Sequence, residues 1–190
     1  MQSTSKRTSL WAVLLTLVVS LPAVAKEVAG VAFPDTVSAG GKELKLNGAG
    51  LRKKLVFNVY AAGLYLQTPA KEASQAIQSD QVKRVRMSML RDLDKKTITE
   101  AIVEGFKKNA KGQLPALQER LDKLAAALPD VKKGDELLLT YVPGQGTTVE
   151  SKSGQKMSLE GKDFADALFS VWLGASPVDG GLKEGMLGKE

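Results

Sequence analysis

The chain has 190 residues and contains neither cysteine nor histidine. These absences exclude disulfide bonds, thiol nucleophiles, zinc sites built from cysteine and histidine, and Ser-His-Asp triads. The 27 basic and 21 acidic residues give a formal net charge of +6, but the lysines are scattered and few aromatic residues lie among them, so nucleic-acid binding is not indicated. The acidic residues also lack the spacing of a calcium loop, and we predict no metal site and no cofactor.

The segment 1–25 has the pattern of a secretory signal peptide. A basic start precedes an apolar run over residues 10–21, and Ala23-Val24-Ala25 then forms a small-x-small cleavage motif. We expect cleavage after Ala25, a periplasmic location and one domain over residues 26–190. An uncleaved anchor is the alternative, but the apolar run is short for a membrane span of about 20 residues. No later segment is apolar enough to cross a bilayer.

Seven segments have the alternation or the bounding turn residues of β-strands. They cover residues 28–33, 43–47, 55–66, 82–90, 136–142, 147–151 and 155–159. Gly48-Ala49-Gly50 is predicted to be a flexible turn, and Gly63 marks a bulge or a close packing contact. Turns at Pro143–Gly146 and Ser153-Gly154 separate the last three strands, which predicts an antiparallel meander.

Three segments have helical periodicity, at residues 96–110, 114–128 and 162–173. Each combines an apolar stripe with a charged back, so we expect surface helices on a flat support. The order of strands, two helices, strands and one helix predicts an α+β fold. One large antiparallel sheet would be covered on one face by a layer of helices.

The stretch 48–66 contains the candidate binding residues. Arg52 stands beside the Gly-Ala-Gly segment, and the apolar residues that follow carry Tyr60 and Tyr65. A cation and a phenol among apolar neighbours suit a pocket for an oxyanion head and an apolar body. On one unbroken strand, however, the eight residues from Arg52 to Tyr60 would span roughly 26 Å at about 3.3 Å each. Either the chain doubles back or bulges near Arg52-Lys53-Lys54, or other residues hold the head group.

Three stretches carry a family resemblance. They are LNGAGLR at 46–52, VYAAGLYL at 59–66 and the closing segment 159–174. With the same order of elements, they resemble a bacterial, exported member of the chalcone isomerase-like family. The resemblance implies an open-faced sandwich, in which the ligand lies between a large sheet and its helices.

In plant chalcone isomerases, an arginine after the Gly-x-Gly turn and a threonine in the next strand contact the substrate, and a Tyr-Lys-Asn set on a helix completes the site. The resemblance places Arg52 at the arginine and Tyr60 at the threonine. It places Ile98, Ala101 and Gly105 at the helical set, so the polar groups needed for acid–base chemistry are missing and no catalytic residue is predicted. It therefore implies the non-catalytic branch, in which Arg52 and Tyr60 hold the carboxylate of a fatty acid or similar small anionic amphiphile.

Two other functions stay open. The first is an intramolecular lyase or isomerase acting on a phenolic or enone substrate, with Tyr65 or Arg91 replacing the lost groups. The second is an envelope interaction module with a filled core and no small ligand. Simpler roles also stay open for single residues: Arg52 as a surface or turn residue, Tyr60 as an ordinary strand tyrosine, and Trp172 as the anchor of the last helix.

Overall fold

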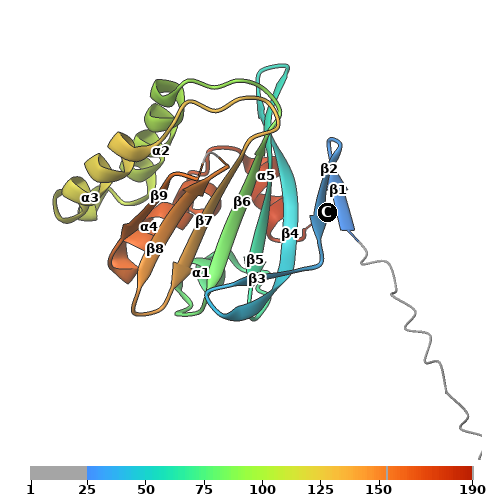
Figure 1. The fold of residues 1–190 in the computed structure, drawn as a ribbon. Coiled ribbons are helices and arrows are strands. Elements are labelled where there is room, and N and C mark those ends of the chain that lie inside the picture. Colours follow the sequence, from blue (N-terminus) through green and yellow to red (C-terminus); the bar gives the residue numbers. More distant parts are fainter. Residues whose placement is uncertain (1–24, 153, 190) are drawn as a thin grey trace, which may run out of the picture.

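The computed structural model describes residues 25–152 and 154–189. Most of the predicted signal peptide lies outside these residues; Ala25 is the first described residue, so the cleavage stays a prediction. The central element is a seven-stranded antiparallel sheet in which each strand pairs with the next one in the chain (Figure 1). Its strands are β3 (Thr36–Ala39), β4 (Lys42–Lys54), β5 (Phe57–Leu66), β6 (Lys83–Met89), β7 (Glu136–Val142), β8 (Gly146–Ser151) and β9 (Lys156–Leu159).

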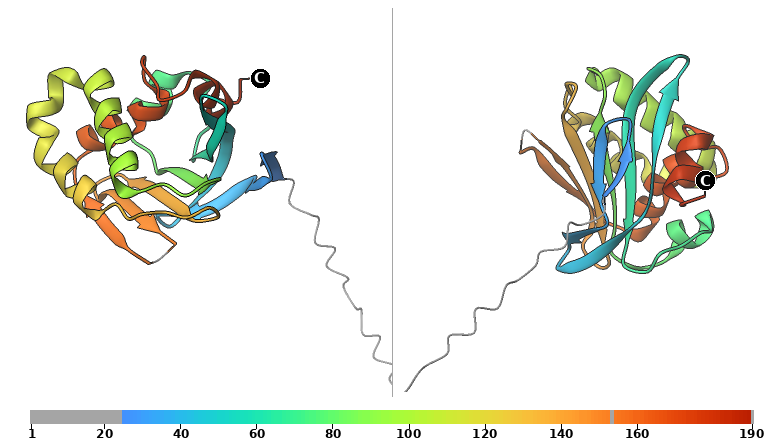
Figure 2. Two further views of the ribbon diagram at one scale, coloured as in Figure 1. Left: turned by 90° about the horizontal axis from the view of Figure 1, so that it is seen from above. Right: turned by 90° about the vertical axis from the view of Figure 1, so that its right-hand side faces the viewer.

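The sheet is curved, and the helices lie on its concave side (Figure 2). They are α1 (Ala73–Gln78), α2 (Lys95–Asn109), the 3-10 turn η1 (Lys111–Gln113), α3 (Leu114–Ala127), α4 (Lys162–Leu173) and α5 (Gly180–Met186). The predicted α+β class and the sheet covered by helices are confirmed. Within the described part of the chain, no helix combines the length and the apolar character that a bilayer span requires.

Helix α4 differs from the predicted surface helix, because it is the central helix of the core. Its side chains from Phe164 to Leu173 are buried except at Asp166. Helices α1, α2 and α5 pack against it, and α2 approaches it closely: a Cβ at Gly105 would lie 2.7 Å from a methyl group of Val171. The lack of a side chain at Gly105 therefore sets the spacing between these two helices.

A small hairpin, β1 (Ala25–Val28) and β2 (Val31–Pro34), lies on the other side of the sheet (Figure 2). The single strand predicted over residues 28–33 is wrong, because Ala29 and Gly30 both take positive φ angles of 50° and 81° and reverse the chain. Phe33 from this hairpin packs over Gly63, whose added Cβ would lie 2.6 Å from the Phe33 ring. The close contact predicted at Gly63 is thus confirmed.

The flexible turn predicted at Gly48-Ala49-Gly50 is also wrong. These residues lie inside β4 and pair with residues 62–64 of β5, next to a bulge between Leu46 and Gly48. A Cβ at Gly48 would lie 2.3 Å from the carbonyl oxygen of Gly185, so the glycine allows α5 to lie directly against the strand.

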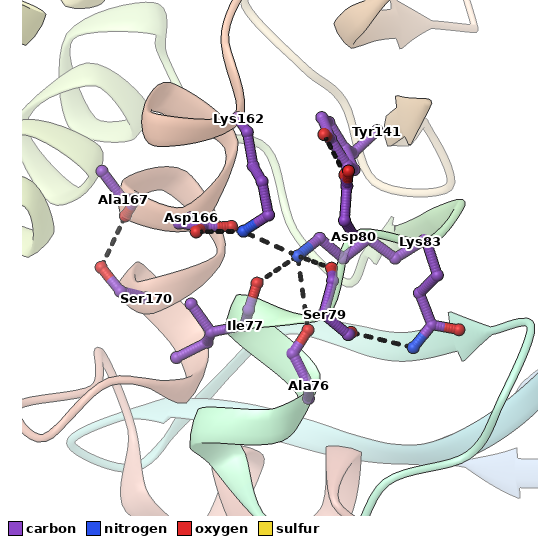
Figure 3. A network of polar contacts seen from close by, with 11 residues as sticks. Ala76, Ile77, Ser79, Asp80, Lys83, Tyr141, Lys162, Asp166, Ala167 and Ser170 are labelled. Atoms are coloured by element: carbon purple, nitrogen blue, oxygen red, sulfur yellow. Dashed lines mark hydrogen bonds and ion pairs between the residues drawn. The ribbon is translucent and has the colours of Figure 1, made fainter. Parts of the chain in front are cut away.

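At the opposite end of β6 from the candidate site, Lys83 joins α1 and α4 to the sheet (Figure 3). Its side chain is fully buried, and Nζ donates to the carbonyl oxygens of Ala76, Ile77 and Ser79, with Asp166 at 3.5 Å. Burial lowers the pKa of Lys83 to about 8, although Asp166 favours the charged form. Since the carbonyl groups end α1, Lys83 caps a helix and is not part of the candidate site.

Candidate functional site

Arg52 and Tyr60 are brought together by a tight hairpin. Strands β4 and β5 are joined by Leu55 and Val56 alone, and Arg52 and Tyr60 are direct partners across the two strands, with an irregularity in register just after Arg52. The guanidinium carbon of Arg52 lies 5.5 Å from the centre of the Tyr60 ring. The chain therefore both doubles back and bulges, which removes the separation that an unbroken strand would impose.

The Arg52 side chain forms no ion pair among the described residues. Its Nε atom is buried and makes no hydrogen bond, and no carboxylate forms an ion pair with its guanidinium group. Its described contact is the stacking on Tyr60. A buried donor without an acceptor is unfavourable, so this guanidinium group is ready to receive an oxyanion.

Tyr60 is buried, and its hydroxyl oxygen accepts a hydrogen bond of 2.9 Å from the indole nitrogen of Trp172 on α4. Burial raises the pKa of Tyr60, and the nearby charge of Arg52 offsets part of this effect. The hydroxyl group is therefore neutral at ordinary pH. Because its oxygen is occupied by Trp172, its own proton remains available for donation to a ligand.

Arg52 and Tyr60 line a cavity of about 740 Å³ between the sheet and the helices. This volume is in the usual range for small-molecule sites. Its inner wall consists of Tyr60 and eight other buried side chains, nearly all of them apolar. The eight are Val59, Met87, Met89, Ile98, Ile102, Leu137, Val171 and Trp172. A pure interaction module was expected to have a filled core, whereas the structure has a cavity between the sheet and the helices.

The positions on α2 at which the resemblance places the helical set of the plant enzymes are apolar and close to the cavity. Ile98 and Ala101 line it, and Gly105 packs against Val171. The polar residues of α2 that line the cavity are Thr97, Glu100, Glu104 and Lys108, and all four are exposed. The inner wall thus offers a cation and a phenol but no acid–base pair.

Neither of the two residues considered as replacements for the catalytic set lies on the inner wall of the cavity. Tyr65 is buried on the outer face of the sheet beside Phe33, and its hydroxyl group has no hydrogen-bond partner. It does not line the cavity. Arg91 does, but it is exposed and lies over the ring of Phe57 at 4.8 Å.

Sequence reasoning missed the part that Trp172 plays. Its predicted anchoring role describes its burial, but its indole nitrogen also orients the Tyr60 hydroxyl group. The sequence feature that could have indicated this role is the position of Trp172 within residues 159–174, the third segment that carries the family resemblance. Over the described residues, no group of three or more acidic side chains has the geometry to hold a metal ion.

The fold and the cavity define an α+β protein with an open-faced sheet and a ligand-sized space beneath its helices. The chain belongs to the chalcone isomerase-like family, whose model matches residues 25–188. The crystal structure of a fatty-acid-binding protein from Arabidopsis thaliana is similar to it, with a TM-score of 0.67 and 18% sequence identity over 87% of this chain and 95% of that chain. At this identity the similarity concerns the fold. No curated protein sequence matches the chain.

Proposed function

We propose that the protein binds, without catalysis, a fatty acid or a similar small anionic amphiphile in the cavity between sheet and helices. The observation that carries the proposal is the buried Nε of Arg52, which has no acceptor and lies at an apolar cavity. The carboxylate would accept hydrogen bonds from Arg52 and from the Tyr60 hydroxyl group. The acyl chain would lie along the apolar inner wall.

The chemistry of the cavity suits both the carboxylate head and the acyl chain of such a ligand. A guanidinium group binds a carboxylate through two parallel hydrogen bonds, and such charge-assisted bonds are stronger in a site shielded from water. Met87 and Met89 supply flexible side chains that adapt to a chain of variable shape. The similar fold of a plant fatty-acid-binding protein is consistent with this proposal.

The periplasmic location is part of the proposal and rests on the signal-peptide pattern of residues 1–25. Expression of the full chain in a bacterium with two membranes, followed by cell fractionation and mass determination of the product, tests it. We expect a product that begins at Lys26 in the periplasmic fraction. A full-length product in the cytoplasm would refute this part.

The ligand proposal is tested by native mass spectrometry of the purified protein and by calorimetric titration with dodecanoate and dodecanol. We expect Arg52→Gln to weaken dodecanoate binding by about tenfold or more and to leave dodecanol binding nearly unchanged, because only the acid has a charge for Arg52 to contact. Arg84→Gln is the matched control, since Arg84 bonds to Thr140 and does not line the cavity. An empty protein that binds no medium-chain acid would refute the proposal. Turnover of a chalcone that is lost in Arg52→Ala would establish the isomerase instead.

A further inference from the structure

The tip of the β4–β5 hairpin exposes apolar side chains. We call residues 53–57 (Lys-Lys-Leu-Val-Phe) the hairpin tip. Leu55, Val56 and Phe57 are 89%, 87% and 53% exposed, and they are the large apolar side chains that stand out to solvent in the described part of the chain. The hairpin extends beyond the end of the other strands (Figures 1 and 2). The three side chains are therefore placed where a flat surface can reach them.

The turn itself is unfavourable for an isolated hairpin. Leu55 takes the first of the two central positions with a φ angle of 55°. Two-residue hairpin loops favour glycine, asparagine or aspartate where φ is positive. Leucine and valine at this place do not help the chain to turn, and they do not pack into the core. Their apolar character indicates a role outside the folded chain.

The hairpin tip is also basic. Lys53 and Lys54 are exposed and form no ion pair with any described residue, and residues 51–59 contain no acid. Arg91 adds a third positive charge over the ring of Phe57. Together these residues present an apolar centre with positive charge around it.

The acidic residues nearby cancel this charge only in part, because most of them already have partners. Asp179 is the acid that contacts the tip directly: its carboxylate accepts a hydrogen bond of 3.0 Å from the backbone N–H of Lys53, and one negative charge stands against the three positive ones. Asp92 pairs with Lys132 at 3.2 Å, and Glu104 pairs with Lys108 at 2.7 Å. Glu100 lies 3.9 Å from Lys96. Asp94 accepts from the backbone of Thr97 as the N-cap of α2. The unpaired cations of this part of the surface are therefore concentrated at the hairpin tip.

The hairpin tip also borders the proposed ligand cavity. Lys53, Lys54, Leu55 and Phe57 are among its lining residues, together with Arg91. Since these residues are exposed, they form part of the mouth of the cavity, and Arg52 directly precedes them in β4. A surface that contacts the tip would thus face the opening through which a ligand must pass.

We propose that the hairpin tip docks the protein on an anionic lipid bilayer, with Leu55, Val56 and Phe57 inserted among the headgroups and with Lys53, Lys54 and Arg91 contacting lipid phosphates. Apolar side chains surrounded by basic ones are the combination that binds such surfaces. Docking would open the cavity toward the bilayer, so that an amphiphile enters or leaves without crossing water. This last step rests on the proposed ligand function, whereas the docking itself does not.

Two double variants test the docking. Leu55→Asn/Val56→Ser removes the two most exposed apolar side chains, and asparagine suits the positive φ angle, so the variant folds at least as well as the natural chain. Lys53→Gln/Lys54→Gln removes two charges from the tip. Lys42→Gln/Lys45→Gln is its matched control, because both lysines are exposed on the same strand but at its other end.

The measurement is cosedimentation with vesicles of phosphatidylcholine alone and of phosphatidylcholine with about one third phosphatidylglycerol. We expect the natural chain and the Lys42/Lys45 control to bind the anionic vesicles. The affinity of both tip variants for these vesicles should be lower by about tenfold or more. Binding should also fall when salt is raised to about 0.5 M. Equal binding to both vesicle types, equal loss in the control, or no binding of the natural chain would overturn the proposal.

The same vesicles separate docking from ligand binding. Because Lys53, Lys54 and Leu55 line the mouth of the cavity, the dodecanoate affinity of each tip variant is measured first, and transfer is then compared at equal loading with ligand. At equal loading, both tip variants should transfer a fluorescent fatty acid to anionic vesicles more slowly than the natural chain. Vesicle binding without any affinity for dodecanoate would refute the ligand function and support docking alone. Unchanged transfer in variants that no longer bind vesicles would overturn the transfer role.

Discussion

Trp172 donates a hydrogen bond of 2.9 Å to the hydroxyl oxygen of Tyr60, and the two residues are 112 positions apart in the chain. The bond connects the last long helix to the strand that carries the proposed head-group site. The bond also determines that Tyr60 can donate a hydrogen bond to a ligand. The indole N–H of Trp172 is a donor only, so the hydroxyl proton of Tyr60 is not used in this bond and remains free for another acceptor. Arg52 and Tyr60 can thus both donate to one carboxylate.

We expect Tyr60→Phe to lower the free energy of unfolding by about 1–2 kcal/mol, because the indole N–H of Trp172 would be left buried without an acceptor. In the double variant with Trp172→Phe, this part of the loss disappears, so the two single effects should add up to more than the double effect. Urea denaturation of the four proteins measures the difference. Strict additivity would show that the hydrogen bond contributes nothing to stability.

Gly48→Ala should lower the free energy of unfolding by about 2 kcal/mol or more. The new Cβ would lie 2.3 Å from the carbonyl oxygen of Gly185, and neither atom can move away without a shift of the backbone. Gly180→Ala is the control in the facing helix. Nothing lies within 4 Å of its Cβ, and alanine favours the helix, so this variant should be neutral or slightly more stable. Thermal unfolding of both proteins is the measurement; a stable Gly48→Ala would mean that α5 does not lie against β4.

Ala101→Trp should weaken dodecanoate binding by about tenfold, because Ala101 lines the cavity and a larger side chain there takes up ligand space. The unfolding temperature should change little, since Ala101 is only partly buried. Ala126→Trp, on the exposed side of α3, makes the same change away from the cavity and should leave binding as it is. Full affinity in Ala101→Trp, measured by calorimetry, would place the acyl chain elsewhere.

The stability of the protein should rise between about pH 8 and pH 10. Burial lowers the pKa of Lys83 to about 8 in the folded chain, whereas a lysine in the unfolded chain keeps its proton up to about pH 10.4. Between these values the unfolded state binds more protons, so the free energy of unfolding increases with pH, by about 2 kcal/mol over this interval.

Above about pH 10 the trend should reverse. Burial raises the pKa values of Tyr60, Tyr65 and Tyr141, so the folded state retains protons that the unfolded state loses. Urea denaturation at a series of pH values measures both limbs. In Lys83→Met the rising limb should be absent while the falling limb persists, and a rise that survives in this variant would assign it to another group.

Much of the fold could be predicted from the sequence, because strict periodicity requires one face to be buried. The helix at 162–173 and the strand at 136–142 have the predicted bounds, and α2 and α3 are shifted or shortened by a single residue. The short helices α1 and α5 were missed, since six or seven residues are too few for a periodic pattern.

The errors concern turns and glycines. Glycines at 48 and 50 were interpreted as a turn, but there they serve close packing of a helix on a strand. A reversal near Arg52-Lys53-Lys54 was one of two alternatives, but its position at Leu55-Val56 was missed because neither residue is typical of a turn. As a result, the candidate site residues Arg52 and Tyr60 were identified, while their position opposite each other depended on a hairpin that composition alone does not indicate.

The bond between Trp172 and Tyr60 has a consequence for how this site can diversify. The proposed head-group contacts, from the charged Arg52 and the neutral Tyr60, come from two neighbouring strands joined by a two-residue loop, whereas α2 and α4 provide much of the apolar wall. Under the proposed function, substitutions on the helices would therefore alter the length or shape of the tail that fits, while the contacts of Arg52 and Tyr60 to the anionic head stay unchanged. Trp172 is the exception, because it is a wall residue that also donates to the Tyr60 hydroxyl oxygen. If the proposed ligand binds here, a change at Trp172 that suits a new tail also changes the contacts to the head group.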